Sequence, residues 1–374
     1  DDPYQNQLNW APAFGYNNYN GFMAGIALYN HTAFQKRIEY EIAPLYDFKN
    51  NTIAGYASIR ANLMFKKIFR QVTIGVQSAR FAYNDEPFIM NYNKVAPYID
   101  FEFKKKNLRS PITQNVIYRN VMLFNESYVY KKLDPWIVPE IPGQYYVPYK
   151  NQINTFIHNI SYKLKNDRTI DPFNITVNAQ LIEKMSKASV TANYFVSLPK
   201  NKKIHFRLFA GKMFNNSTTG DYRFRMSGQT GYQDYTYDNV YFGRNATVPN
   251  IGAQQFTETD GAFKVYTPLG QSDDWIIALN IKTPKIFKIP AFIYSDIGIY
   301  NAKGLDAPEM LYSLGVGVPL IKDIIEIYFP VLNSKNITDV QKLNNSNRYL
   351  DQIRFTFYLN RANPFEVIKN NLPF

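Results

Sequence analysis

Two acidic residues, Asp100 and Glu102, stand two positions apart in a stretch where polar and apolar side chains alternate. On a β-strand this spacing puts both carboxylates on one face, where a carboxylate pair can act as general acid and base. The same spacing also suits a network of ion pairs with arginines that fills an interior. We favour the network because no second catalytic feature accompanies the pair.

Known catalytic motifs are missing from the 374 residues. The sequence has no His-Glu-x-x-His zinc motif, no Gly-x-Ser-x-Gly elbow and no phosphate-binding or dinucleotide-binding loop. Its three histidines, His31, His158 and His205, are far apart, and it has no cysteine. Zero cysteine excludes disulfides, a thiolate nucleophile and cysteine-based metal sites. We therefore predict no catalytic residue, no cofactor and no metal in this chain.

The net charge is strongly positive, with 42 Lys and Arg against 30 Asp and Glu, a difference of +12. These basic residues are spread along the chain, apart from short runs at 104–106 and 200–203, so we expect no nucleic-acid partner. Basic turns beside a membrane suit anionic lipid headgroups. With 45% hydrophobic and 19% charged residues, the composition is that of a folded protein.

Period-two alternation dominates the sequence. Ile99, Phe101 and Phe103 alternate with the two acidic residues, and Phe355 and Phe357 flank polar neighbours in the same way. No run reaches the ~20 apolar residues of a transmembrane helix, whereas strands of roughly ten residues are long enough to cross a bilayer as part of a barrel. Helical periodicity is almost absent. The pattern predicts an all-β fold of long strands, with a soluble all-β protein as the rival interpretation.

Turn signals divide the chain into an even number of strands, about 16, which lets the first and last strands pair antiparallel and leaves no open edge in hydrocarbon. We predict a transmembrane antiparallel β-barrel over the whole of residues 1–374. The predicted spans are 7–15, 20–30, 37–48, 52–65, 69–83, 93–105, 113–126, 150–165, 171–183, 188–199, 203–214, 274–282, 290–301, 310–319, 324–333 and 350–360.

Connection lengths support a membrane barrel. If the N-terminus enters from the periplasm, the long connections fall on the outer side and the short turns on the periplasmic side, as in outer-membrane barrels. The long extracellular loops lie near 127–149 and 215–273. The first is rich in proline and aromatic residues, and we expect an ordered loop over the barrel mouth. The predicted location is the bacterial outer membrane, with lipid and lipopolysaccharide as partners.

Charged residues in mid-strand would face the lumen. If the second long loop dips inside, Arg244 could pair with an acidic residue such as Asp100, Glu102 or Asp296; the alternative is a loop exposed to solvent. The predicted lumen network comprises Arg60, Asp100, Glu102, Arg207, Arg244, Asp296, Glu326 and Arg354.

The C-terminal third resembles the outer-membrane assembly-factor superfamily, whose sixteen-stranded barrels insert or translocate proteins. Residues 274–282 and 291–301, with Asp296-Ile297-Gly298, are similar to a late hairpin of that superfamily. Tyr241-Phe242-Gly243-Arg244 lies in the loop where the superfamily keeps a lumen-inserted Arg-Gly motif, although the order of residues differs.

A second resemblance covers nearly the whole chain. The motifs at 20–30, 43–46, 241–244 and 324–330 are similar, in this order, to the C-terminal barrel of Gram-negative gluzincin zinc aminopeptidases. In that family a catalytic zinc domain precedes the barrel, and none of its zinc ligands is present here. This resemblance implies a barrel that anchors a zinc-aminopeptidase-like domain, whose full-length parent is a metallopeptidase.

Three functions follow from these patterns. We expect a membrane anchor or platform, possible partners being other outer-membrane or periplasmic proteins. The first alternative is an assembly or translocation barrel, which needs a weak seam between the first and last strands, and the second is a passive channel. The start Asp1-Asp2-Pro3 lacks the features of a signal peptide, so we expect a mature chain or a domain cut from a longer protein.

Overall fold

A computed structural model describes residues 8–30, 35–107, 109–132, 146–200, 202–216, 222–244, 251–285, 290–321, 324–344 and 348–358. The chain forms two compact units. The first comprises Asp1–Leu63, Thr73–Ile99 and Arg119–Ile157, and the second comprises Met64–Val72, Asp100–Tyr118 and His158–Phe374.

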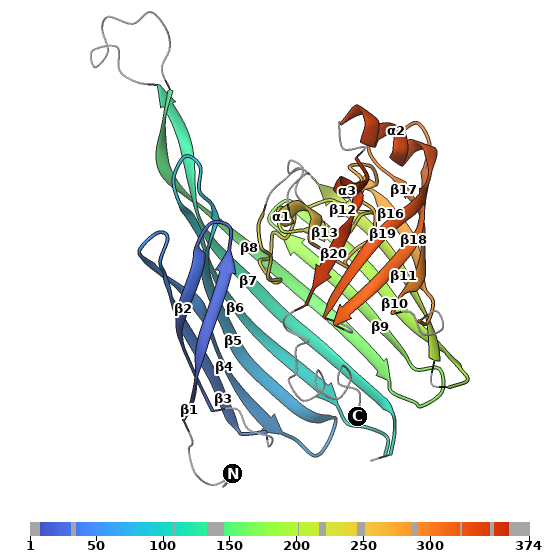
Figure 1. The fold of residues 1–374 in the computed structure, drawn as a ribbon. Coiled ribbons are helices and arrows are strands. Elements are labelled where there is room, and N and C mark those ends of the chain that lie inside the picture. Colours follow the sequence, from blue (N-terminus) through green and yellow to red (C-terminus); the bar gives the residue numbers. More distant parts are fainter. Residues whose placement is uncertain are drawn as a thin grey trace, which may run out of the picture. The chain divides into compact units, whose positions relative to one another are not determined.

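Sixteen strands form one sheet in the order β1 to β11 and then β16 to β20 (Figure 1). Each paired strand is antiparallel to its neighbour, as in β1 with β2 and β19 with β20. The order has two end strands, β1 and β20. The strands are β1 (Asn9–Asn17), β2 (Gly21–Tyr29), β3 (Ile38–Asp47), β4 (Thr52–Met64), β5 (Phe69–Asn84), β6 (Met90–Phe103), β7 (Ile112–Lys132), β8 (Tyr146–Asn166), β9 (Phe173–Ile182), β10 (Met185–Leu198), β11 (Lys202–Asn216), β16 (Trp275–Lys282), β17 (Phe292–Asn301), β18 (Glu309–Ile321), β19 (Ile325–Asn333) and β20 (Arg354–Phe357).

The all-β fold and the sixteen strands predicted from alternation are confirmed. β7 and β8 are longer than predicted, because they continue into the expected outer loop. The rest of that loop, 133–145, lies outside the described residues. The last strand is shorter, because the helix α3 (Tyr349–Gln352) takes the residues where the strand was expected to begin. The helix α2 (Lys335–Leu343) was not predicted.

In the first unit, many large apolar side chains of the strands are exposed. Trp10 and Phe14 on β1 are each 69% exposed, and Ile53 on β4 is 68% exposed. The opposite face packs Met23, Leu45 and Ala54 together. This distribution is the reverse of a soluble sheet, whose exposed face is polar, and it is typical of strands that face lipid.

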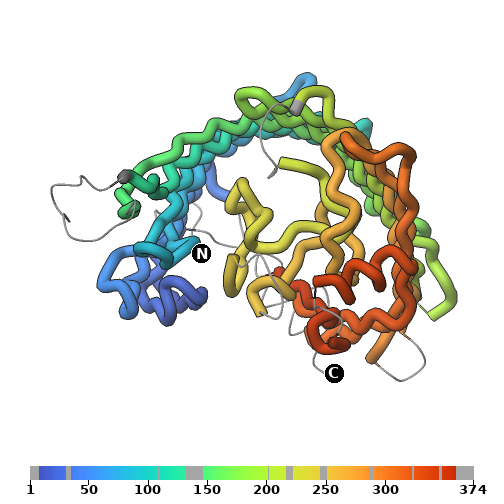
Figure 2. Tube along the Cα trace, turned by 90° about the horizontal axis from the view of Figure 1, so that it is seen from above, coloured from blue at the N-terminus to red at the C-terminus, as the bar shows by residue number. Residues whose placement is uncertain are grey.

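In the second unit, the connection between β11 and β16 folds back against one face of the sheet. We call residues 222–244 and 251–272 the folded-back segment. It contains the two-residue strands β12 (Phe224–Arg225), β13 (Gln229–Thr230), β14 (Phe256–Thr257) and β15 (Gln271–Ser272) and the short helix α1 (Ile251–Gln254). Figure 2 shows this segment, in yellow, on the inner side of the curve made by the green and orange strands of the same unit.

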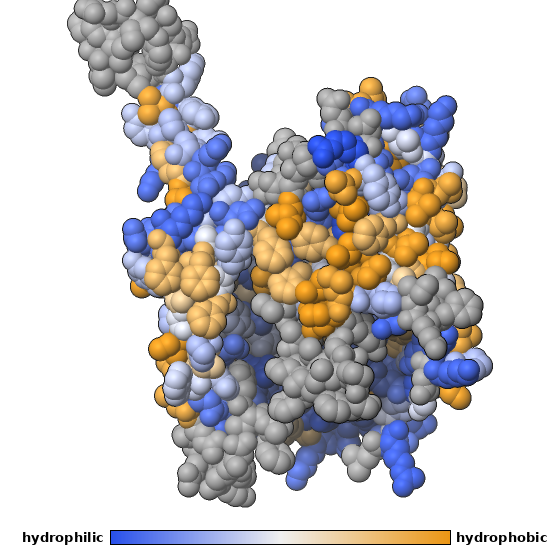
Figure 3. All heavy atoms as spheres, in the orientation of Figure 1, coloured by the Kyte–Doolittle hydropathy of each residue, from blue (hydrophilic) through white to orange (hydrophobic). Residues whose placement is uncertain are grey.

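The strands beneath the segment alternate between two chemically distinct faces. On β17, Phe292, Tyr294 and Asp296 are buried, whereas Ile293 and Ile297 are exposed. We call the buried side of β11 and β16–β20 the covered face. The exposed side is aliphatic, and hydrophobic side chains gather on the surface over β19, β20 and their neighbours (Figure 3). Such a continuous exposed apolar surface needs an apolar environment.

Among the described residues, no helix combines the length and the hydrophobicity required to cross a membrane.

Candidate functional site

The covered face holds a buried ion pair between the segment and the sheet. Lys264 Nζ lies 2.9 Å from Asp296 Oδ1 on β17, and the Lys264 backbone N–H donates to Oδ2 of the same carboxylate, also at 2.9 Å. Asn280 on β16 donates a third hydrogen bond to Asp296. The two charged side chains are 1% and 0% exposed. Because such charges are costly to bury unless they are paired and hydrogen-bonded, this contact holds the segment in one position.

A second chain of ion pairs lies beside the first. Lys282 Nζ on β16 lies 2.6 Å from Glu258 of the segment and 2.9 Å from Glu326 of β19. The Tyr328 hydroxyl donates to Glu326 at 2.5 Å, and Lys264 lies 3.7 Å from Glu258. One lysine therefore bridges a carboxylate of the segment and a carboxylate of the sheet.

Two arginines of the sheet bind backbone carbonyls of the segment. Arg207 Nη1 on β11 donates to the Asp260 carbonyl at 2.8 Å and to the Asn280 side chain at 2.9 Å. Arg354 Nη1 on β20 donates to the Ser227 carbonyl at 2.6 Å and to the Phe263 carbonyl at 3.0 Å. The Arg354 guanidinium also lies 4.0 Å from the centre of the Phe256 ring. The last strand is thus attached to the segment as well as to β19.

Close packing requires glycine where the segment meets its neighbours. A Cβ on Gly261 would lie 2.6 Å from the Met226 carbonyl oxygen and 2.7 Å from Met226 Cα. A Cβ on Gly298 of β17 would lie 2.4 Å from Met226 Sδ. All three distances are too short for real contacts, so Met226 packs closely only because residues 261 and 298 have no Cβ.

The eight predicted network residues separate into three groups. Arg207, Asp296, Glu326 and Arg354 lie on the covered face, each with its own partners there. Arg60 pairs with Glu39 at 2.6 Å in the first unit. Asp100 accepts from Asn115 and Glu102 pairs with Arg70, so both have partners on adjacent strands.

Arg244 stays within its own loop. Its guanidinium donates to the carbonyls of Gly231 and Asp234, pairs with the Asp234 carboxylate at 3.4 Å and lies 4.3 Å from the centre of the Tyr237 ring. The contacts described for Arg244 are thus with its own loop, whereas Asp296, one of its three suggested partners, pairs with Lys264. The segment does pack against the sheet, but it is attached by a lysine twenty residues further along the chain.

The sequence interpretation missed Glu258, Lys264 and Asn280. Asn280 and Lys282 share one face of β16 by period two, so alternation alone marks that face as polar. Lys264 directly follows the Asp260-Gly261-Ala262-Phe263 turn. No local signal marks Lys264 or Glu258 as a partner of the sheet, because both lie in irregular backbone.

The arrangement holds a segment in place, and its charged groups are occupied by one another. Both glutamates of the second chain contact Lys282, and His205 stacks on Phe195 with ring centres 4.4 Å apart. In the part of the chain that the structure describes, no group of three or more His, Cys, Asp or Glu side chains is placed to bind a metal.

No protein-family model matches the chain, and no curated protein matches it. Several solved structures are similar, and two of them are described here. BamA from Haemophilus ducreyi lacking POTRA domains 1–3 has a TM-score of 0.48 and 10% identity, over 94% of this chain and 70% of that one. CdiB from Acinetobacter baumannii has a TM-score of 0.38 and 11% identity, over 88% of this chain and 57% of that one. The chain thus spans little more than half of CdiB.

Both structures are similar to most of this chain, at low sequence identity. They give no support to the resemblance to gluzincin aminopeptidases.

The attachment of the segment is expected to depend on pH through Glu258. Burial by itself raises the pKa of this carboxyl, but Lys282 and Lys264 outweigh burial and hold the pKa below the ordinary value of 4.5. The stability that ionised Glu258 contributes is therefore complete above that value and is lost as the pH falls below it. We expect Glu258→Gln to be less stable than the wild type at neutral pH, with the difference closing below about pH 4. Urea unfolding in detergent micelles at several pH values measures this difference.

Asp260 serves as a control, because its pKa is shifted in the opposite direction to that of Glu258. Burial holds the pKa of Asp260 above 3.8 in spite of the nearby Lys187 and Arg225. Its ionisation therefore weakens the fold, and Asp260→Asn should gain stability relative to the wild type as the pH rises through about 4. A stability difference for Glu258→Gln that stays constant down to pH 2 would contradict the assignment.

Proposed function

We propose that this chain is an integral outer-membrane β-barrel that assists the assembly or translocation of other proteins. The proposal rests on the length and the position of the last strand. β20 is four residues long and stands at the end of the sheet order. It pairs with β19 through Ile325–Tyr328, and part of its other edge is bridged by Gln255 of the folded-back segment. So short a strand can close a barrel only through a weak seam.

The exposed faces of both units support insertion in a membrane. Aliphatic and aromatic side chains cover them, and in hydrocarbon every strand edge must be paired. We propose that β1 and β20 meet and close the barrel, that the short turns face the periplasm, and that the partners are membrane lipid and other outer-membrane or periplasmic proteins.

A passive channel is the weaker candidate. A channel needs a continuous aqueous path, whereas here the segment is held on the covered face by the Lys264–Asp296 pair and by Lys282. Anchoring of a zinc-aminopeptidase-like domain rests on the sequence resemblance alone, and no observation on the described residues favours it.

A disulfide lock across the seam tests the proposal. Because the chain has no cysteine, introduced cysteines react only with each other. We expect a cysteine at Phe357 to form a disulfide with a cysteine at one of the β1 positions when Asn9–Asn17 are scanned singly. The oxidised pair should stop the protein from promoting folding of a test outer-membrane protein in proteoliposomes, and reduction should restore that activity.

A lock between strands that are already fully paired is the matched control. Ala11 and Ala27 are directly opposed on β1 and β2, and an Ala11→Cys/Ala27→Cys disulfide should leave activity unchanged. If the seam lock forms and activity persists, an opening seam is not required. If the unlocked protein has no activity in the same assay, the assembly function is wrong.

A further inference from the structure

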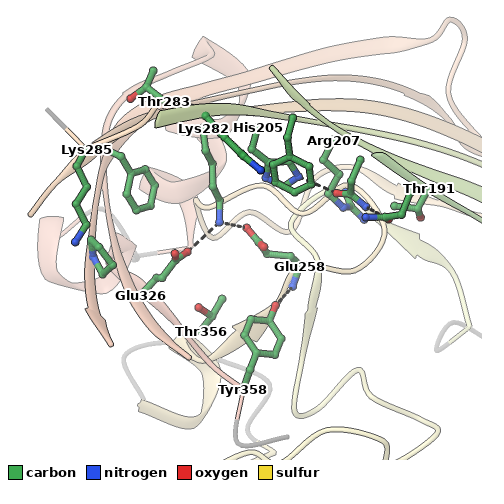
Figure 4. A pocket seen from close by; sticks show the side chains of 16 residues that line it. Thr191, His205, Arg207, Glu258, Lys282, Thr283, Lys285, Glu326, Thr356 and Tyr358 are labelled. Atoms are coloured by element: carbon green, nitrogen blue, oxygen red, sulfur yellow. Dashed lines mark hydrogen bonds and ion pairs between the residues drawn. The ribbon is translucent and has the colours of Figure 1, made fainter. Parts of the chain in front are cut away.

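A cavity of about 550 Å³ lies on the covered face of the second unit, at the ends of the strands that are joined by short turns (Figure 4). Its position follows from its lining. Lys203 stands beside the β10–β11 turn, Lys285 lies in the β16–β17 connection, and Pro319 and Glu326 flank the β18–β19 turn. Its volume is within the roughly 300–1,000 Å³ that is usual for small-ligand sites.

The charges that line this cavity are unbalanced. Lys203, Arg207, Lys282 and Lys285 line it together with two carboxylates, Glu258 and Glu326. Both carboxylates are already bridged by Lys282. A cationic ligand would therefore find no unpaired carboxylate among the described lining residues.

No ion pair is recorded between the remaining cations and a carboxylate in the described part of the chain, although Glu258 and Asp260 act on Arg207 at longer range. Arg207 donates to a backbone carbonyl and to the Asn280 amide, which are neutral acceptors. The structure records no ion pair for Lys203 or Lys285 with any described residue, and both side chains are exposed. Ammonium and guanidinium groups bind oxyanions through charge-assisted hydrogen bonds. A negatively charged ligand would therefore balance the charges that line this cavity.

Neutral groups give the wall a fixed shape. His205 Nε2 and Asn193 Oδ1 are 2.9 Å apart, and Asn193 donates to Asn174 at 2.9 Å. The stack of His205 on Phe195 holds the imidazole in one orientation. The cavity therefore has an ordered polar wall beside the excess positive charge.

Several turns at the same end of the second unit carry lysines. In antiparallel strands, alternate turns lie at the same end, and the turns of the second unit at this end carry Lys66 and Lys67, the run 104–106 and Lys200. Clustered charge of one sign raises the local concentration of the opposite ion. An anion approaching from this end would be drawn towards the cavity.

We propose that this cavity binds the oxyanion group, carboxylate or phosphate, of a ligand that enters from the short-turn end. The inference does not depend on the proposed assembly function, because it concerns binding at a site that the function does not use. Lys203 and Lys285 are the residues expected to recognise the ligand, since the other cations also hold the folded-back segment.

Calorimetric titration of the full chain in non-ionic detergent tests the proposal with two probes, tetraglutamate and inorganic pyrophosphate, in 100 mM salt. At this ionic strength, charges more than about 10 Å away are largely screened. We expect at least one probe to bind, and Lys203→Gln/Lys285→Gln to weaken it by about tenfold or more, which corresponds to about 1.4 kcal/mol.

The matched control removes the same charge from the same end but outside the cavity. Lys67→Gln/Lys106→Gln changes two exposed lysines that do not line it, and the expected loss is below about threefold. Binding of tetraglutamate alone identifies a carboxylate ligand, binding of pyrophosphate alone a phosphate ligand, and binding of both a general oxyanion site. Equal losses in both variants, or no binding of either probe at millimolar concentration, would overturn the proposal.

Discussion

Asp296→Ala is expected to destabilise the protein by about 3–5 kcal/mol, the cost of removing one partner of a buried ion pair. The substitution leaves the Lys264 ammonium, which is 1% exposed, without its carboxylate. It also removes the acceptor of the Asn280 amide and of the Lys264 backbone N–H. Thermal unfolding in detergent micelles, followed by the gel shift between folded and heat-denatured barrel, measures the loss.

Glu102→Ala is the matched control. Its pair with Arg70 is partly exposed, with side chains 18% and 54% accessible, and such pairs contribute only about 0–1 kcal/mol. Lys264→Met/Asp296→Leu, which removes both charges, should recover most of the stability lost by Asp296→Ala, because no unpaired charge remains buried. If Asp296→Ala and Glu102→Ala cost the same, the buried pair does not hold the segment.

Gly261→Val is expected to open the interior by displacing the folded-back segment. Its Cβ would clash with the carbonyl oxygen and Cα of Met226, which are backbone atoms and cannot rotate away. Overpacking of this kind typically costs about 1–3 kcal/mol, enough to shift the segment while the long strands stay paired. Single-channel recordings in planar bilayers should show several-fold higher conductance for the variant than for the wild type.

The control for Gly261→Val adds the same kind of bulk elsewhere. Ala307 is exposed in the connection between β17 and β18, and Ala307→Val should leave conductance at the wild-type level. A Gly261→Val protein that is folded and conducts no better than the wild type would show that the segment does not block the lumen.

These two expectations bear on the proposed function through Arg354. This side chain belongs to the last strand but donates to carbonyls of the segment. Movement of β20 away from its place would therefore break contacts with the segment, so the last strand and the segment are physically coupled. A variant that releases the segment should also loosen the last strand.

Alternation revealed the strands because each one is long and has an apolar face and a polar face. Ile293 and Ile297 alternate with Tyr294 and Asp296 on β17, and this period requires no knowledge of the partner strand. The length of β20 was overestimated because Ile353 and Phe355 continue the period, whereas the residues before them form the turn of helix α3. Pattern alone does not distinguish a strand from a short helix at its end.

Sequence pattern accounted for only part of the candidate site. The faces of Arg207, Asp296, Glu326 and Arg354 followed from period two, since a strand residue has just two directions in which to point. Their partners did not follow, because Lys264 and Glu258 lie in irregular backbone where sequence spacing says nothing about direction. Arg244 was a candidate only on the condition that its loop enters the lumen, and in the structure it donates to the carbonyls of Gly231 and Asp234 in its own loop.

Local pattern was enough to predict a sheet of sixteen strands with one aliphatic and one polar face, because these properties repeat every two residues. It did not predict that the long connection folds back onto the covered face, that Lys264 pairs with Asp296, or that four cations line one cavity. Those contacts join residues distant in the chain, and their energy depends on burial, which no local pattern encodes.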